Sequence, residues 1–305
     1  MDVLSDVVGT ARTGRPHSAR VTHTAPFGRW FPATSAAGFH VALQGGCWVL
    51  PSGAEPIRLG PGDVVFFPTG AAHGIADDPA TPLVPAPASP GAARYGAAAN
   101  GRAPATVLLC GAYLLDRAAA HPLLRDLPEV IHLPAGPGRH PELRTAAELL
   151  GAELRDPPRP GADAMLPALL DLLLLHILRA WFADRRADAG GGWAAAPHAP
   201  HVSAALRAIH ADPGRPWTVE ELGRRARLSR AAFARRFTRL VGRPPLAYLT
   251  WWRLTTAARL LRTGDAPVAA IARQVGYASP YAFTHAFKRQ YGTPPGAYRT
   301  AGRAS

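Results

Sequence analysis

The chain has 305 residues, enough for two domains that each bury a core of their own. Hydrophobic residues make up 48% of the sequence and charged residues 18%, a globular composition that excludes a fibrous or disordered chain. The two cysteines, Cys47 and Cys110, are too few for a disulfide framework and fit a reducing cytoplasm.

The charge is concentrated in the last third of the chain. Residues 201–305 hold 18 Lys and Arg against 4 Asp and Glu, a net charge of +14. The whole chain carries +13, which leaves −1 for residues 1–200. A general preference for arginine would not place the excess in one third, so we expect a polyanion to bind residues 201–305.

The first residues, MDVLSDVVGT, lack the pattern of a signal peptide, and we expect a cytoplasmic protein. Between residues 20 and 75, short apolar runs alternate with Gly and Pro, which predicts strands. A loop rich in Pro, Ala and Gly is expected at 76–105, before a further strand at 106–116. Together these segments predict a small antiparallel barrel or sandwich.

The segment GDVVFFPTGAAH (62–73) resembles the second sequence motif of the cupin barrel through Gly62, Pro68, Gly70 and His73. In metal-dependent cupins this histidine is one ligand, and a first motif supplies two histidines and a glutamate. Here the glutamate position falls at Gly38 and the histidine positions near Pro32 and Thr34. The sequence therefore predicts no cofactor and no catalytic residue.

A pocket inside this barrel is nevertheless expected. Alternation along a strand puts His40 on the face of position 38, where it can lie beside His73 and be reached by Cys110. Two histidines and a cysteine are also a plausible zinc set, although they lack a compact ligand spacing. Core histidines beside an inert buried cysteine are the alternative that we favour. The candidate effector pocket comprises His40, Phe66, His73 and Cys110.

Helices are expected to follow at 141–155 and 165–182, the second with a broad apolar face. Asp171, His176 and Arg179 interrupt that second segment, so we expect it not to cross a membrane. Its leucines can cover the barrel or form a homodimer interface, and we favour the dimer. Residues 188–200, rich in Gly, Ala and Pro, predict a linker.

An internal repeat with an offset of 50 dominates residues 201–305, with nine identities from Ser229–Tyr248 to Ser279–Tyr298. Each copy predicts a helix, a turn and a second helix. Thr218 and Glu221 form a capping-box pattern, and Ser229 and Ser279 are suited to cap the second helices. The chain between the copies, about 245–262, predicts a helix of about 25 Å.

The second helix of each copy has an apolar stripe that includes two phenylalanines, Phe233 and Phe237 or Phe283 and Phe287. The opposite face carries Ala231, Arg235 and Thr238 in the first copy, and Tyr281, His285 and Lys288 in the second. A helix of this kind fits the DNA major groove, and the connecting helix can place two of them in successive grooves about 34 Å apart. A basic helical bundle that binds protein or RNA is the alternative.

Two stretches, WTVEELGRRARLSRAAFARRFTRLVGRPPLAYLTWWRL (217–254) and VAAIARQVGYASPYAFTHAFKRQYGTPPGAYR (268–299), resemble the AraC/XylS-type transcription regulators. The family's base-contacting positions correspond to Ala231, Ala234, Arg235, Pro280, Tyr281, Thr284 and His285. Phosphate contacts are expected at Ser229, Arg230, Arg236, Arg239, Arg243, Ser279, Lys288 and Arg289. The segments 39–49, 59–73, 107–116 and 122–134 resemble the cupin sensor domain of one branch of that family.

These resemblances imply an α+β protein of several domains: a cupin-like β-barrel, a helical connector and an all-α double helix-turn-helix. We expect the sensor domain at 1–135, the connector and dimerisation region at 136–187, the linker at 188–200 and the DNA-binding domain at 201–305.

The expected function is sequence-specific regulation of transcription, as activator or repressor, in response to a small-molecule effector. The expected partners are double-stranded promoter DNA, a second copy of the chain through 165–182 and, as a candidate, RNA polymerase. The competing hypotheses are a cupin enzyme or metallosensor with an accessory DNA-binding domain, and a non-specific nucleoid-type protein.

Overall fold

The computed structural model describes residues 4–6, 8, 16–86, 106–114, 124, 127–155, 159–185 and 199–304. Most of the predicted loop at 76–105 and of the predicted linker at 188–200 lies outside these residues. The chain forms two compact units. The strand unit comprises Thr13–Leu115 and Leu127–Asp184, and the helical unit comprises Met1–Arg12, Asp116–Asp126 and Arg185–Ser305.

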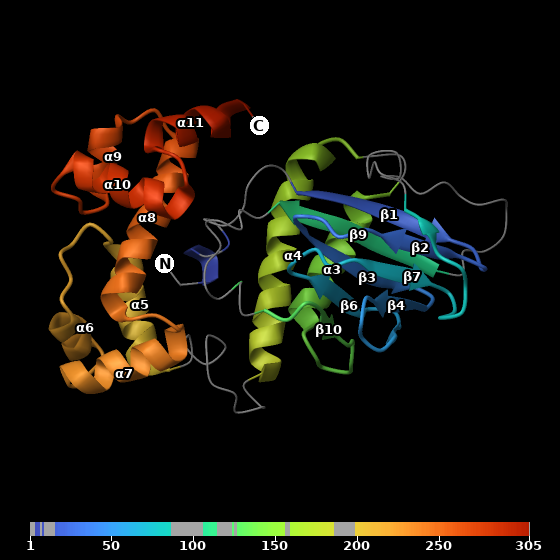
Figure 1. The fold of residues 1–305 in the computed structure, drawn as a ribbon. Coiled ribbons are helices and arrows are strands. Elements are labelled where there is room, and N and C mark those ends of the chain that lie inside the picture. The colour runs from blue at the N-terminus through green and yellow to red at the C-terminus, as the bar shows by residue number, and fades with distance from the viewer. Residues whose placement is uncertain are drawn as a thin grey trace. The chain divides into compact units, whose positions relative to one another are not determined.

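The strand unit contains two sheets of five strands each (Figure 1). The first sheet has the order β1 (His17–His23), β9 (Thr106–Leu114), β3 (Ala36–Gln44), β6 (Val64–Phe67) and β10 (Ile131–Leu133). The second has the order β5 (Ile57–Leu59), β4 (Cys47–Pro51), β7 (His73–Ala76), β2 (Gly28–Phe31) and β8 (Val84–Pro85). Neighbouring strands are antiparallel, except for the parallel pair β2 and β8.

The strands confirm the predicted cupin-like architecture. They form two facing sheets rather than one closed barrel, and apolar residues of both sheets fill the space between them. This core contains Phe27, Ala42, Cys47, Val49, Leu59, Val65, Phe67, Ile75 and Leu108.

The cupin-like motif at 62–73 contains the turns at both ends of β6. Gly62 has φ +91° and Gly70 has φ +66°, a left-handed conformation that favours glycine. A Cβ on Gly70 would also press against the carbonyl oxygens of Thr34 and Ala36. The carboxylate of Asp63 accepts hydrogen bonds from the backbone N–H groups of Gly60 and Ala135, at 2.8 Å and 2.6 Å. Turn geometry and backbone hydrogen bonds therefore explain Gly62, Asp63 and Gly70 without a metal ligand.

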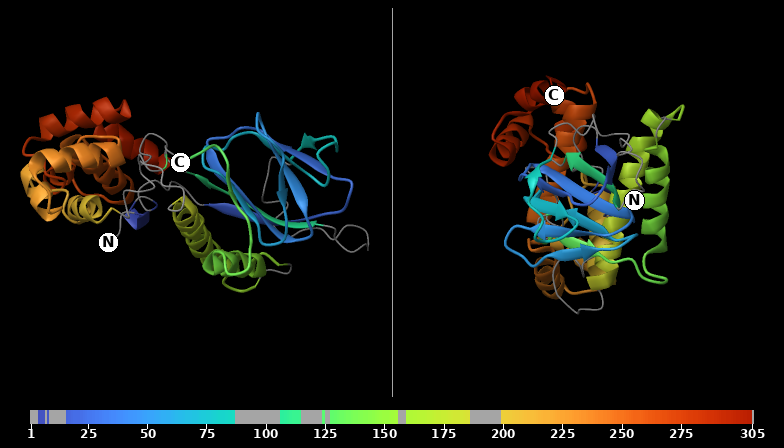
Figure 2. Two further views of the ribbon diagram at one scale, coloured as in Figure 1. Left: turned by 90° about the horizontal axis from the view of Figure 1, so that it is seen from below. Right: turned by 90° about the vertical axis from the view of Figure 1, so that its right-hand side faces the viewer.

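Two helices, α3 (Pro141–Glu153) and α4 (Ala162–Arg185), cover the outer face of the first sheet (Figure 2). Gly151 of α3 packs closely against Leu43, and the Tyr113 hydroxyl donates a hydrogen bond to the Leu170 carbonyl oxygen of α4 at 2.8 Å. By length and composition α4 could cross a membrane, but half of its most apolar window is buried, and core helices of soluble proteins meet the same criteria.

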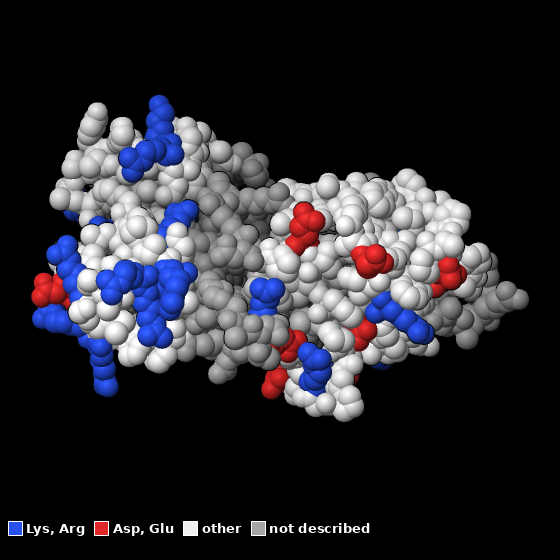
Figure 3. Space-filling model, turned by 60° about the horizontal axis from the view of Figure 1, so that its bottom comes forward, with Lys and Arg blue, Asp and Glu red and all other residues white. Residues whose placement is uncertain are grey.

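The helical unit contains α5 (Pro200–Ala211) and the predicted duplicated motif. One helix-turn-helix unit is α6 (Val219–Arg225) with α7 (Arg230–Val241); the other is α9 (Val268–Gln274) with α10 (Pro280–Tyr291). The long helix α8 (Pro245–Thr263) joins them, and α11 (Pro295–Ala304) follows. On the face drawn in Figure 3, most Lys and Arg side chains gather over this unit.

The predicted helix ends are confirmed. Thr218 and Glu221 form a reciprocal capping box, and the hydroxyls of Ser229 and Ser279 accept hydrogen bonds from the N–H groups of Ala232 and Ala282. Gly276 follows α9 with φ +85°, the left-handed conformation expected there. In both copies, therefore, a serine three residues before the amide that it binds fixes the start of the second helix.

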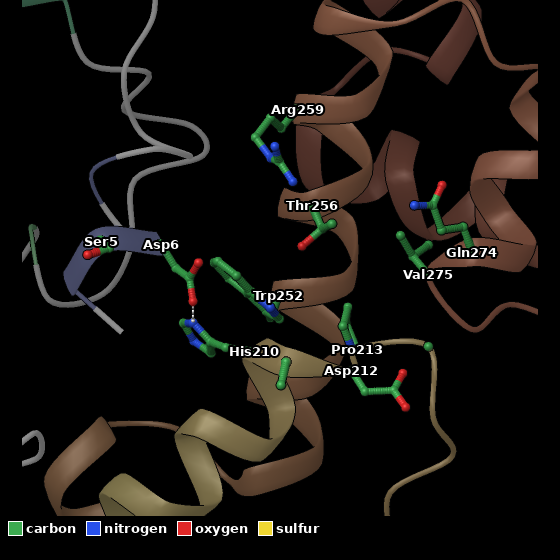
Figure 4. A pocket seen from close by; sticks show the side chains of 12 residues that line it. Ser5, Asp6, His210, Asp212, Pro213, Trp252, Thr256, Arg259, Gln274 and Val275 are labelled. Atoms are coloured by element: carbon green, nitrogen blue, oxygen red, sulfur yellow. Dashed lines mark hydrogen bonds and ion pairs between the residues drawn. The ribbon is translucent and has the colours of Figure 1, made fainter. Parts of the chain in front are cut away.

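An N-terminal segment contributes to the helical unit. The Asp6 carboxylate lies 2.9 Å from His210 Nδ1 (Figure 4). His210 Nε2 forms a 2.7 Å hydrogen bond with the Tyr248 hydroxyl. The imidazole also stacks on Trp252, with ring centroids 3.9 Å apart. Asp6 and His210 are both buried, so this pair connects the N-terminal segment to α5 and α8 away from water.

We predict that Asp6→Ala destabilises the helical unit by about 1–3 kcal/mol, because His210 loses its buried carboxylate partner. Calorimetric unfolding of the full chain measures this. The control is Glu55→Ala, which removes an exposed carboxylate of the strand unit. Equal unfolding curves for the two variants would contradict the prediction.

Candidate nucleic-acid interface and sensor cluster

Helix α7 presents the predicted base-contacting face of the first unit. Phe233 and Phe237 are fully buried on one side, whereas Ala231 and Arg235 are exposed on the other. Ala234 is half-buried, and its side chain is short. Arg235 is therefore the long side chain on this face that can reach the edge of a base pair.

Helix α10 presents the corresponding face of the second unit. Tyr281 is 82% exposed, and Pro280 and His285 are exposed beside it. Thr284 is half-buried, and its hydroxyl donates to the Pro280 carbonyl oxygen at 2.9 Å. Tyr281 and His285 are thus the accessible polar side chains at the start of this helix.

Most of the predicted phosphate-contacting side chains are exposed, and α7 and α10 contain no acidic residue. Arg243 differs, since it is half-buried and its guanidinium lies 5.9 Å from the centre of the Trp251 ring. Ser229 and Ser279 use their hydroxyls as helix caps. The exposed residues of the set are Ser229, Arg230, Arg236, Arg239, Ser279, Lys288 and Arg289.

Three of the four predicted pocket residues meet inside the strand unit, and we call His40, His73 and Cys110 the sensor cluster. His40 Nδ1 lies 3.0 Å from Cys110 Sγ, and His40 Nε2 lies 2.8 Å from His73 Nε2. His73 Nδ1 lies 2.8 Å from the Ala71 carbonyl oxygen. His40 therefore stands between the other two side chains.

The hydrogen-bond partners assign every proton in the sensor cluster. A carbonyl oxygen only accepts, so His73 Nδ1 carries a proton, and in neutral His73 the Nε2 atom is an acceptor. The neighbouring His40 Nε2 must then donate, which leaves His40 Nδ1 to accept from the Cys110 thiol. The result is a directed chain from the thiol through both imidazoles to the Ala71 carbonyl oxygen.

Burial keeps all three groups neutral. It lowers the pKa of His73 from an ordinary 6.5 to about 4, despite the opposing effect of the hydrogen bond to Ala71. Burial, together with the nearby His73 and His23, lowers the pKa of His40 well below its ordinary value. Burial raises the pKa of the Cys110 thiol above its ordinary range. These directions agree with the proton assignment.

Phe66, the fourth predicted pocket residue, does not join the sensor cluster. Successive residues of β6 point to opposite faces, so Phe66 lies with Phe39 and Tyr113 on the helix-covered face of the sheet. Its neighbour Phe67 occupies the inner face and stacks on His73, with ring centroids 3.7 Å apart. Phe31 of β2 also stacks on His73, at 5.1 Å. Strand alternation would have selected Phe67, whereas Phe31 has no local signal.

The nitrogen and sulfur atoms of the sensor cluster that could bind a metal do not point toward one common position. Cys110 lies at Nδ1 of His40 and His73 lies at Nε2, on different edges of the same ring. Among the residues that the structure describes, no group of three His, Cys, Asp or Glu side chains is arranged to hold a metal ion. A zinc set of His40, His73 and Cys110 would need a different geometry.

Comparison with known proteins agrees with this organisation. Family models for a cupin and for a helix-turn-helix domain match residues 2–183 and 222–301. A Streptomyces antibioticus protein described as an AraC-like transcription regulator is 36% identical, and the match covers 98% of each chain. The transcriptional regulator AlkR of Acinetobacter baylyi is 31% identical, over 98% of this chain and 99% of its own. The crystallised DNA-binding domain of AdpA, in complex with a target DNA, is 40% identical over 34% of this chain and 94% of its own, with a TM-score of 0.33.

A strand-rich cupin domain followed by two helix-turn-helix units defines a class of DNA-binding regulator. The chain belongs to the AraC-like family of transcription regulators. The predicted class of function is thereby confirmed.

We predict that acid destabilises the strand unit through the sensor cluster. The pKa of His73 is about 6.5 in the unfolded chain and about 4 in the folded one. Between these values the unfolded chain binds a proton that the folded chain does not, so the free energy of unfolding falls as the pH drops through this window. His73→Phe keeps the stacked ring and removes this contribution, so the unfolding temperature should decline less steeply between pH 7 and pH 5. Calorimetry at several pH values measures the slope.

The control for this experiment is His285→Phe, at an exposed position of α10. It should leave the pH dependence of the strand unit as in the wild type. A wild-type slope in His73→Phe would show that His73 does not cause the acid sensitivity.

Proposed function

We propose that the protein is a cytoplasmic regulator that reads two DNA elements, one with α7 and one with α10. The observation that carries this proposal is the pair of serine-capped helices, each with a buried aromatic stripe and an exposed face free of acidic residues. A helix of this construction fits the major groove. Base contacts are proposed for Ala231, Ala234, Arg235, Pro280, Tyr281, Thr284 and His285.

The exposed arginines divide into two roles in this proposal. Arg235 lies on the base-contacting face of α7, where its planar group can pair with the edge of a guanine. Arg236 and Arg239 lie beside that face and suit the phosphates. Arg230, Lys288, Arg289 and the two capping serines complete the proposed phosphate set, and the half-buried Arg243 contributes less.

We predict that Arg235→Ala and Arg239→Ala weaken DNA binding differently. Arg235→Ala should cost about 1–3 kcal/mol on a preferred sequence and reduce base preference. Arg239→Ala should lower the affinity for preferred and random DNA by the same factor. It should also reduce the slope of log affinity against log salt concentration by about one. Fluorescence anisotropy with a duplex selected from a random pool, and with a random duplex, measures both effects.

Equal losses on the selected and the random duplex for both variants would contradict this division of roles. Wild-type protein with no preference between the two duplexes at physiological salt would instead support a non-specific nucleoid-type protein.

We further propose that the sensor cluster detects a small-molecule effector and that the strand unit performs no catalysis. The directed hydrogen-bond chain supports this, because a ligand that takes one donor or acceptor must alter the others. The positions expected for the first cupin motif hold Gly38, Pro32 and Thr34, which supply no metal-binding side chain of the cupin type. A metallosensor or enzyme therefore finds less support than an effector-binding domain.

A homodimer through α4 is the proposed assembly, with promoter DNA and RNA polymerase as its proposed partners. The inner side of α4 packs on the first sheet, but its outer side exposes Met165, Ala168 and Leu172, and α3 exposes Leu149. An exposed apolar stripe on a helix of the proposed connector, 136–187, fits a second copy of itself. Two copies would also double the DNA contacts.

We predict that Leu172→Glu converts a dimer into a monomer, because it places a charge in the apolar interface. Size-exclusion chromatography with light scattering measures the mass. The control is Leu246→Glu, which changes a leucine of the helical unit that is 43% exposed, against 38% for Leu172. A wild-type protein that is monomeric, or a Leu172→Glu variant that stays dimeric, would exclude this interface.

A further inference from the structure

The two helix-turn-helix units share α8 as their core. The first half of α8 packs on the first unit, with Tyr248 against Phe237 at 5.7 Å. The second half packs on α9 and α10. This second contact buries Leu254, Ala257, Ala258, Leu261, Ile271, Ala272, Val275, Phe283 and Phe287.

Arg253 lies between these halves of α8 and reaches the loop before the first unit. Its Nε donates a 2.7 Å hydrogen bond to the Pro213 carbonyl oxygen, and its Nη2 donates a 2.8 Å hydrogen bond to that of Arg215. Desolvation lowers the pKa of this half-buried arginine, against opposing effects of Tyr277 and Asp212. The planar guanidinium of Arg253 thus donates hydrogen bonds to two backbone carbonyl oxygens of one loop.

That loop is held together by contacts of Trp217 and is joined to α6 of the first unit by an ion pair. The Arg215 guanidinium forms a 3.1 Å ion pair with Glu221 of α6, and it lies 4.3 Å from the centre of the Trp217 ring. The Trp217 indole N–H donates to the Asp212 carbonyl oxygen at 2.9 Å. The Arg225 guanidinium of α6 also lies 5.0 Å from the centre of the Trp217 ring, so a displacement of the loop would disturb its contacts with α6.

The second unit meets the same loop through its turn. A Cβ on Gly276 would press against the Gly214 carbonyl oxygen and lie 2.8 Å from Arg253 Nη2. A Cβ on Gly214 would lie 2.7 Å from the Gln274 carbonyl oxygen. A pocket of about 530 Å³ lies beside this contact and is lined by both segments and by α8 (Figure 4).

We propose that Arg253, Gly214 and Gly276 form a clamp that fixes the angle and separation of α7 and α10. The clamp joins the loop that holds α6 to the turn that leads into α10, and its donor comes from the helix that both units share. It makes the regulator selective for the spacing between its two DNA elements. Arg253 is a positioning residue here, since it touches no DNA in this assignment.

The selectivity follows from DNA geometry. One inserted base pair moves the second element by about 3.4 Å and turns it by about 34° around the DNA axis. Units held at one angle can then engage only one element, or must deform the DNA at a cost in free energy. Without the clamp, the units can rotate about α8 and follow the displaced element.

The proposal rests on the proposed function of α7 and α10, and the experiment separates the two. The probe is a duplex selected by the wild-type protein from a random pool. Its derivatives carry one base pair inserted or removed between the two elements, or have one element scrambled. The clamp variants are Arg253→Ala and Gly214→Ala, the second of which opens the contact without removing a charge.

The matched controls change the same residue types elsewhere in the helical unit. Arg259→Ala removes an exposed arginine of α8, and Gly296→Ala adds a methyl group where nothing lies within 4 Å. Both should retain the spacing preference of the wild type. Thermal unfolding followed by circular dichroism checks that each variant is folded.

We expect the wild type to lose about tenfold or more in affinity on a probe with altered spacing, comparable to the loss of one good base contact. The clamp variants should lose no more than about threefold on the same change, about 0.7 kcal/mol, while their affinity for scrambled-element probes stays at the wild-type value. A merely structural defect would lower the affinity for every probe and leave the spacing ratio unchanged.

A wild-type spacing ratio in both clamp variants would overturn the clamp and show that α8 alone fixes the units. A selected sequence with only one element would overturn it as well. Where Arg253→Ala is unfolded, Arg253→Lys replaces it, because an ammonium group lacks the fork that spans two carbonyls. Failure of the base-contact assignment would appear separately, as a lack of preference for the selected duplex.

Discussion

The burial of aromatic side chains against α8 is the interaction on which the DNA-binding architecture depends. A helix-turn-helix of about 25 residues cannot bury enough apolar surface to be stable by itself. Helix α8 supplies the missing core to both copies, with Tyr248 and Trp251 in one half and Leu254 and Leu261 in the other. Since folding depends on the inner faces, the outer faces of α7 and α10 are free to carry the residues that suit one DNA sequence.

The strand unit has a different requirement, the burial of three polar side chains in an apolar core. In the sensor cluster each proton is used once: the thiol donates to an imidazole, that imidazole donates to the next, and the last donates to a backbone carbonyl oxygen. In a hydrogen-bond chain of this kind every buried donor of the cluster has an acceptor. An unsatisfied buried donor would be the main free-energy cost of placing such groups in a core. The hydrogen-bond chain also makes the three side chains change together, since each tautomer depends on its neighbour.

The sequence predicted features that local chemistry decides. The repeat, the serine caps, the capping box at Thr218 and the left-handed Gly276 all depend on residues within one turn of the chain. Strands β8 and β10 lie outside the ranges in which the sequence predicted strands, because their two or three residues carry little periodic signal.

Contacts between segments that are distant in the chain have no comparable local pattern in the sequence. Asp6 and His210 are separated by 204 residues, and the bonds from Arg253 end on backbone carbonyls that any residue could provide. The pairing of His40 with His73 and Cys110 was predictable, because strand alternation and a motif placed each on an inner face. Applied to β6, the same alternation selects Phe67 instead of Phe66.

An effector can change DNA binding only through unequal affinity for two states, so the sensor cluster needs a physical route to the rest of the molecule. Strand β9 provides one within the strand unit. Cys110 faces the cluster, and Tyr113, three residues later, faces the other side of the sheet, where its hydroxyl binds the Leu170 carbonyl oxygen of α4. A rearrangement of the thiol end of the chain thus acts on a strand that is hydrogen-bonded directly to α4. The exposed side of that helix is the proposed dimer interface, so the proposed sensing and the proposed assembly involve one strand and one helix.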